Sequence, residues 1–151
     1  NRGVRMTPYS TVFRVFLGKI TDPAYATLDI EVSEDDMMIL LDDAILNFDY
    51  PKVDLKTKDD VTQQFTNDLN FDEIQLVGHL MAYAWLRRQL RDVELLRQTM
   101  SPLEFQKYSQ ANHINSLIKL EEQDWAYIER LKKRYSRREN NASLLYKLGG
   151  E

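Results

Sequence analysis

The sequence predicts a mainly α-helical fold: a helical bundle with two long helices, a small β-hairpin or extended loop, and an extended C-terminal tail. Residues 71–98 and 109–137 carry apolar side chains at the spacing of long amphipathic helices. A capping residue followed three positions later by an acid marks three helix starts. Residues 136–151 break the helical pattern. We therefore expect a bundle domain over residues 1–135, with a projecting loop at about 52–69, and a partner-docking tail over residues 136–151.

The composition is that of one folded domain without redox chemistry. The chain has 151 residues, 43% of them apolar, which is enough for a hydrophobic core. It has no cysteine, so it needs no disulfide and fits a reducing cytoplasm. Because no run of about 18 apolar residues is present, we expect no membrane span. No apolar stretch follows Arg2 and Arg5, so we expect no secretory signal.

Two short helices are expected in the first 50 residues. Thr7 can cap the first helix through its hydroxyl group. Pro8 fits the first helical position, because a helix needs no hydrogen bond from the N–H group there. Gly18 and the Asp22-Pro23 pair are expected to end this helix. Ser33, followed by three acids, caps the second helix, and Pro51 stops it. The apolar residues expected on the buried side of the second helix are Met37, Leu40, Leu41, Ala44, Ile45 and Phe48.

Residues 52–69 are the least helical stretch of the chain. Apolar residues there flank a polar turn at 56–60, which favours a small β-hairpin. An extended loop remains the alternative, because no Asn-Gly or Asp-Gly turn is present. A loop that projects from a bundle is where contacts with a neighbouring molecule are usually made. We therefore predict an inter-subunit loop formed by Val53, Leu55, Val61 and Phe65.

Two long helices follow. The Asn70–Glu73 capping box starts the first, which is apolar almost all round over residues 76–86, so we expect it at the centre of the bundle with Trp85 buried. Another capping box at 101–104 opens about one turn, and we place the start of the second long helix at Ser109. The predicted buried side of this last helix is formed by Ala111, Ile114, Ile118, Trp125, Ile128, Leu131 and Tyr135.

No motif for catalysis, a metal or a cofactor is present, so we predict no cofactor and no enzymatic activity. A serine triad would have to use His79 or His113, and no Gly-x-Ser-x-Gly elbow presents a serine. Neither histidine has a second ligand at the spacing of a zinc site. We interpret His79 as a core or interface histidine. The acids at 35–36, at 42–43 and at Asp49 are interpreted as a solvated helix face. An enzyme would need carboxylates that converge from separate helices.

Charge is distributed unevenly along the chain. Residues 1–75 hold 7 basic and 15 acidic side chains, a net charge of −8, whereas residues 76–151 hold 13 and 9, a net charge of +4. Copies could pack acidic side to basic side around a ring, but such asymmetry is also common in monomers. Three interpretations are open for the basic group: cations at a helix C-terminus, contact with an acidic protein, and contact with nucleic acid. This group comprises Arg130, Lys132, Lys133, Arg134, Arg137 and Arg138.

The predicted tail has a polar spacer and then the apolar cluster Leu144, Leu145, Tyr146 and Leu148. Exposed apolar groups tend to be buried, so the cluster either folds back on its own bundle or anchors the tail to a partner. Because the tail lies beyond Tyr135, the last periodic apolar position, we expect the bundle to be stable without residues 136–151.

Four segments of the chain form a recognisable pattern. They are Met6-Thr7-Pro8-Tyr9-Ser10-Thr11-Val12-Phe13, Phe16-Leu17-Gly18-Lys19-Ile20, Tyr50-Pro51 and Ser109-Gln110-Ala111-Asn112-His113. These segments resemble neck proteins of tailed bacteriophages, the head–tail connector or adaptor proteins of the virion. The resemblance covers about residues 6–138 and does not include the tail. It is a pattern of segments rather than a catalytic signature.

The resemblance implies a small helical protomer that forms a homo-oligomeric ring of about twelve copies. Such a ring docks on the portal protein, meets further neck or tail proteins, and belongs to the virion after synthesis in the host cytoplasm. Genomic DNA would pass through without sequence-specific binding, and the acidic N-terminal half would line the channel. The alternative is a helical nucleic-acid-binding or regulatory protein that uses the basic segment 130–138. By position and composition, the portal-binding residues are expected to be Arg130, Arg134, Arg137, Arg138, Leu144, Leu145, Tyr146 and Leu148.

Overall fold

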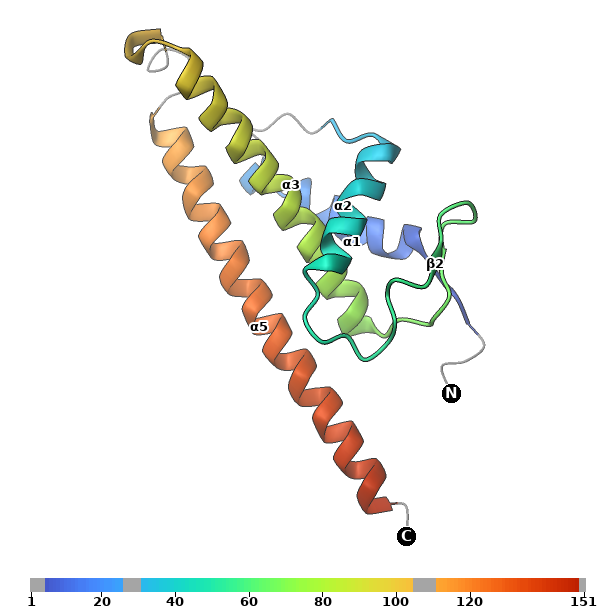
Figure 1. The fold of residues 1–151 in the computed structure, drawn as a ribbon. Coiled ribbons are helices and arrows are strands. Elements are labelled where there is room, and N and C mark those ends of the chain that lie inside the picture. Colours follow the sequence, from blue (N-terminus) through green and yellow to red (C-terminus); the bar gives the residue numbers. More distant parts are fainter. Residues whose placement is uncertain (1–4, 26–30, 105–110, 150–151) are drawn as a thin grey trace.

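The computed structural model describes residues 5–25, 31–104 and 111–149, and its fold is mainly helical, as predicted. Helix α3 packs against the other three long elements, α1, α2 and α5. Figure 1 shows α3 between α5 on one side and α1 and α2 on the other, with the C-terminal end of α5 reaching past the rest of the chain. The helices are α1 (Tyr9–Ile20), α2 (Glu34–Leu46), α3 (Phe71–Thr99) and α5 (Ala111–Gly149), with a 3-10 turn at Pro23–Tyr25.

A three-stranded antiparallel sheet contains the predicted hairpin. Its strands are β1 (Thr7–Pro8), β2 (Lys58–Asp59) and β3 (Gln64–Phe65), in the order β1-β3-β2. Asp59 holds the hairpin turn, because its Oδ1 accepts hydrogen bonds from the N–H groups of Val61 and Thr62 at 2.9 and 3.3 Å. Gln63 adopts the positive φ, 54°, that glycine usually supplies in such turns. The hairpin therefore forms without an Asn-Gly or Asp-Gly pair.

The start of α1 differs from the prediction, because the sheet takes the place of a side-chain cap. Pro8 is the N-cap residue, and Thr7 does not cap the helix. The Thr7 hydroxyl instead accepts a hydrogen bond from the Leu69 N–H at 2.8 Å and donates one to Asp68 at 3.3 Å. The Tyr9 N–H, which a cap would satisfy, donates to the Gln63 carbonyl at 2.9 Å.

The predicted start of α2 is confirmed. The Ser33 hydroxyl accepts a hydrogen bond from the Asp36 N–H at 3.1 Å, and the Asp36 carboxylate accepts one from the Ser33 N–H at 3.4 Å. Hydrogen bonding of the Asp36 carboxylate to the Ser33 side chain, and then to the Ser33 N–H, holds the pKa of Asp36 below its usual value. The helix ends at Asn47, before Pro51. Of the predicted buried side, Met37 is partly buried, and the residues in the core are Leu40, Leu41, Ala44, Ile45 and Phe48.

Helix α3 is the central element, as predicted. Asn70 and Glu73 form the expected capping box, with reciprocal hydrogen bonds of 2.8 Å. Trp85 lies in the core, where its ring meets the edge of Tyr25 at 5.9 Å between centroids. Gly78 lets α1 approach closely, since a Cβ there would lie 2.5 Å from Cγ1 of Val15. The absence of a side chain at this position thus sets the spacing between α1 and α3.

Helix α5 continues through the segment expected to be an extended tail, and this part of the prediction is wrong. The helix runs unbroken from Ala111 to Gly149, 39 residues or about 58 Å. Residues 136–143 contain Arg, Glu, Ala, Asn and Ser but no Pro or Gly, so nothing in them ends a helix. The loss of apolar periodicity after Tyr135 reports the end of packing, because the described side chains beyond Glu139 are all exposed. The boundary expected at residue 136 falls inside one helix.

The buried side of α5 also differs in part from the predicted set. Ile128, Leu131 and Tyr135 are buried as expected, whereas Ile118 and Trp125 are about 40% exposed. The helix buries two residues that the prediction omitted, Leu117 and Asp124. The expected start at 109, and the side chains at 111, 113 and 114, lie outside the described residues. The capping box before α5 is confirmed, because Ser101 and Glu104 bond reciprocally at 3.1 and 3.2 Å.

Candidate interaction surfaces

Helix α5 is fixed to the start of α3 by a buried hydrogen-bond cluster. The Tyr135 hydroxyl donates to Oε2 of Glu73 at 2.8 Å and accepts from the Lys52 N–H at 2.8 Å. Glu73 is fully buried, and its other oxygen takes part in the α3 capping box. Burial, together with the Glu73 bond, raises the pKa of Tyr135. Asn70 reaches one turn further along α5 and donates to Glu139 at 3.0 Å. The capping residues of α3 therefore also hold α5.

Beyond Glu139 the helix stands free of the body. We name residues 140–149 the C-terminal arm. No described side chain of the arm forms a hydrogen bond or ion pair with the rest of the described chain. Its apolar residues, predicted as an anchor, are 56–83% exposed, so in this structure the cluster does not fold back on its own bundle. These residues are Leu144, Leu145, Tyr146 and Leu148.

The predicted basic residues do not form one surface. Arg138 donates to both oxygens of Asp72 at 2.8 Å, and Lys132 lies 3.0 Å from Asp49, so these two cations are used within the protomer. Arg130 lies over the Tyr127 ring, 5.6 Å from its centroid. The others in the group, Lys133, Arg134 and Arg137, are exposed and pair with no acid among the described residues.

The predicted inter-subunit loop is divided between the core and the surface. Leu55 and Phe65 are buried in the protomer's own core, and Val53 is partly buried against it. Only Val61 is available to a neighbour, with 93% of its surface exposed. Lys58 joins the hairpin to α2 by an ion pair with Asp42 at 2.9 Å, and it also lies 2.7 Å from Asp60. Phe65 is the buried residue of β3, whereas Leu55 lies in the core from the segment before β2.

A buried polar group on α5 was missed by the sequence prediction. Asp124 accepts a short hydrogen bond from the Tyr25 hydroxyl and lies 3.3 Å from Nζ of Lys19. Burial is the largest cause that raises the pKa of Tyr25, and the hydrogen bond to Asp124 is the second. His79 of α3 lies nearby, with its ring against the edge of Tyr127 at 5.0 Å. A single acid four residues before Ile128, on the apolar side of the helix, was the available signal.

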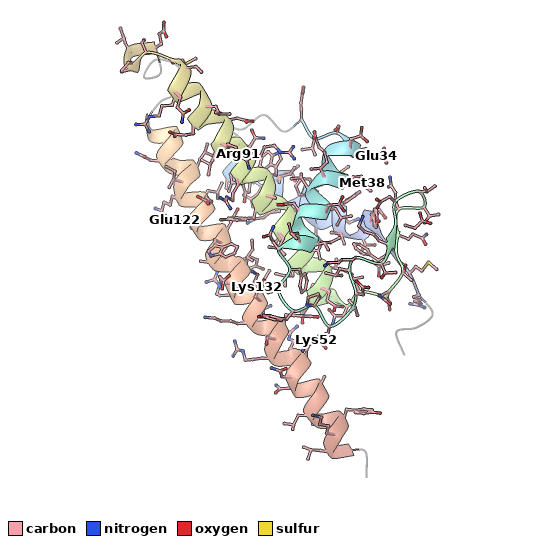
Figure 2. The ribbon with its side chains drawn as sticks, viewed as in Figure 1. Glu34, Met38, Lys52, Arg91, Glu122 and Lys132 are labelled. Carbon is pink, nitrogen blue, oxygen red and sulfur yellow. The ribbon has the colours of Figure 1, made fainter. Side chains whose placement is uncertain are left out.

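A groove of about 470 Å³ lies between α2, α3 and α5. Tyr83 donates a hydrogen bond to Glu121 at 3.0 Å, and burial together with this bond raises the pKa of Tyr83 to about 12. Arg91, labelled in Figure 2, is exposed on the rim. Apolar and charged side chains both line this groove, but the charged groups do not point toward one common position. Its lining includes Asp43, Leu46, Tyr83, Arg87, Arg91 and Trp125.

Within the described ranges, no group of three or more His, Asp or Glu side chains could hold a metal ion. None of the helices that the structure describes is long and apolar enough to cross a membrane.

Comparison with known protein families, with curated proteins and with solved structures finds no match to this chain.

Proposed function

We propose that this chain is a structural, non-enzymatic protein of the neck of a tailed bacteriophage. In this proposal it is a head–tail connector that assembles as a homo-oligomeric ring in the virion, docks on the portal protein and continues the DNA channel toward the tail. The resemblance of residues 6–138 to neck proteins motivates the proposal. It requires no cofactor.

The observation that carries the proposal is the C-terminal arm. A helix that leaves its own body and exposes Leu144, Leu145 and Leu148 is suited to a surface outside the protomer. Burial of a leucine side chain contributes about 1.5–3 kcal/mol, so three of them can hold a short helix on a partner after ordering costs. The nearby hydrogen bond from Tyr135 to Glu73 fixes the direction in which the arm leaves the body.

The test is binding to purified portal rings by co-sedimentation. The variant Leu144→Gln/Leu145→Gln/Leu148→Gln keeps helix propensity and removes apolar surface, and we expect binding at least about 100-fold weaker. The matched control Asn140→Gln/Asn141→Gln changes polar positions of the same arm and should bind as the wild type does. Equal binding by the leucine variant and the wild type contradicts the proposal.

The alternative function, nucleic-acid binding, is favoured by exposed cations on α5, Lys133 and Arg134, which have no acidic partner among the described residues. Duplex DNA binding that weakens steeply with salt, together with no binding to portal rings, would support it over the neck proposal. The variant Lys133→Gln/Arg134→Gln would then lose DNA affinity, while the arm variant would not.

A further inference from the structure

Helix α2 exposes an apolar pair framed by acids. Ile39 and Leu46 are 59% and 76% exposed and lie seven residues apart, so they share the side of α2 that faces solvent. Asp35, Asp42 and Asp43 flank them on the same side. Only Asp42 forms an ion pair among the described residues, with Lys58. We name these five residues the acidic face. An apolar centre with a charged rim is the usual anatomy of a protein–protein contact.

Helix α5 exposes cations on the side that points away from α3. Arg130, Lys133, Arg134 and Arg137 follow the spacing of three, four and seven residues that places side chains on one face of a helix. All four are exposed, and none pairs with an acid within the described ranges. We name these four residues the basic face.

The two faces cannot meet within one protomer. Both α2 and α5 pack against α3, and the basic face lies on the side of α5 away from that contact. On α2, Asp43 and Leu46 line the groove described above, and the other residues of the acidic face lie outside it. In Figure 2, Glu34 of α2 and Glu122 of α5 are labelled on opposite sides of the molecule, with α3 between them. The acidic face and the basic face can therefore meet only between molecules.

We propose that the basic face of one copy docks on the acidic face of the next copy. This contact joins two different surfaces, so it repeats from copy to copy and closes a ring when the rotation per copy permits. The aliphatic stems of the arginines cover Ile39 and Leu46, while their guanidinium groups reach the flanking carboxylates. The inference deepens the proposed ring by naming its subunit contact, and it rests on the proposed function only for ring closure.

A nucleic acid is the other class of partner that the basic face could take. Phosphates would neutralise the cations of α5 but would leave Ile39 and Leu46 exposed beside Asp35 and Asp43, which form no ion pair within the described ranges. A second copy satisfies both faces at once, which is why the observations favour it.

The experiment is a charge swap read by sedimentation velocity at low and high salt. The variant Asp35→Lys/Asp43→Lys changes the acidic face from three negative charges to one net positive charge, and Lys133→Glu/Arg134→Glu removes the net positive charge of the basic face. We expect each to need at least about tenfold higher concentration than the wild type to self-associate. An equimolar mixture of the two variants, and the chain that carries all four substitutions, should regain association because opposite charges meet again. The control Asp92→Lys/Glu94→Lys reverses two exposed charges near the end of α3 and should behave as the wild type does.

Each outcome decides the inference separately from portal docking, which depends on the arm. Association that survives both reversals, or that the mixture and the fourfold variant fail to regain, overturns the proposed contact. A free wild-type chain that stays monomeric at low salt up to about 1 mM also overturns it, whether or not it binds portal rings. Loss of DNA binding in Lys133→Glu/Arg134→Glu with unchanged self-association assigns the basic face to nucleic acid instead.

Discussion

At the scale of single residues, the close packing of α1 on α3 depends on the lack of a side chain at Gly78. A Cβ on Gly78 would lie 2.5 Å from Cγ1 of Val15 and 3.3 Å from the Val12 carbonyl oxygen. Because Val15 belongs to a rigid helix, it cannot move aside as the end of a long side chain could. A sequence pattern alone shows a glycine inside a strongly apolar helix, which is unfavourable for helix formation, and does not show the close approach that requires it.

We predict opposite effects for the same substitution at two glycines. Gly78→Ala should lower the free energy of unfolding by about 1–3 kcal/mol, because it forces α1 away from α3. Gly18→Ala should raise it by up to about 1 kcal/mol, because nothing lies within 4 Å of that Cβ and alanine favours the helix. Urea unfolding measures both values. Equal effects at the two positions would show that α1 and α3 are farther apart in solution.

Trp85 should be the largest single contributor to the core. It is 1% exposed and packs against the buried ring of Tyr25. Trp85→Ala should therefore cost about 3–5 kcal/mol through lost burial and the cavity left behind. Thermal unfolding monitored by circular dichroism would measure the loss. An unchanged melting temperature would place α3 at the periphery.

His79 should make the protein less stable in acid. Burial, and then the nearby charge of Lys19, lower the pKa of His79 to about 4, while Asp124 partly opposes them. The unfolded histidine titrates near 6.5, so the unfolded state takes up the proton first and stability falls as the pH drops from about 6.5 to 4. The full loss is roughly 3 kcal/mol. The difference in unfolding free energy between wild type and His79→Gln should change over this range. A constant difference contradicts the assignment.

At the scale of elements, the starts of helices were easier to predict from the sequence than their ends. Segments expected to be non-helical were also harder to predict. The boxes at Ser33, Asn70 and Ser101 were identified correctly, because a cap is a local hydrogen-bond pattern written in neighbouring residues. Thr7 was misassigned, because its hydroxyl bonds to residues 68 and 69, which only the tertiary fold brings near. Residues 136–149 were misassigned because apolar periodicity reports packing, and this part of the helix has nothing to pack against.

The boundary of the dispensable segment should lie after Asn140 rather than after Ser136. Arg138 and Glu139 bond to Asp72 and Asn70, whereas no described side chain of residues 141–149 bonds to the body. Truncation after Asn140 should leave the unfolding free energy unchanged. Truncation after Ser136 should lower it by about 1–2 kcal/mol, through one exposed ion pair and one partly buried hydrogen bond. Equal stability of the two truncated chains would show that neither contact contributes.

At the scale of the whole molecule, the uneven charge along the chain has both an internal and an external part. Lys132 with Asp49 and Arg138 with Asp72 join the basic C-terminal half to the acidic N-terminal half within one protomer. The basic face has no acidic partner within the described ranges, and of the three acids in the acidic face only Asp42 is paired, with Lys58. The sequence shows the uneven distribution of charge. It does not show which charged residues pair within the protomer and which stay exposed, because that depends on how the helices pack on α3.

The candidate surfaces were only partly predictable for the same reason. The four apolar residues of the arm were identified from sequence and are exposed. Leu55 and Phe65 were assigned to a surface loop but lie in the core. The pairing of β3 with β1 and β2 turns Phe65 inward, and Leu55 reaches the core from the segment before β2. Ile39 and Leu46 were not identified, since two apolar residues on an otherwise acidic helix face carry no signal until the buried side is known.

The arm links the behaviour of the whole molecule to its proposed role, and hydrogen exchange can follow it. An isolated helix shorter than about 12–15 residues is marginal in water, and residues 140–149 have no described hydrogen bond or ion pair to the body that would support them. Amide exchange should therefore be fast over 141–148 in the free protein and slow over 117–135, where Leu117, Ile128 and Tyr135 are buried. On portal rings, exchange over 141–148 should become slow, because burial of the leucines removes the opening that permits it. The Leu144→Gln/Leu145→Gln/Leu148→Gln chain should show fast exchange both with and without portal rings. Slow exchange over 141–148 in the free wild type would mean that the arm is held by its own chain, and its role as a free anchor would be refuted.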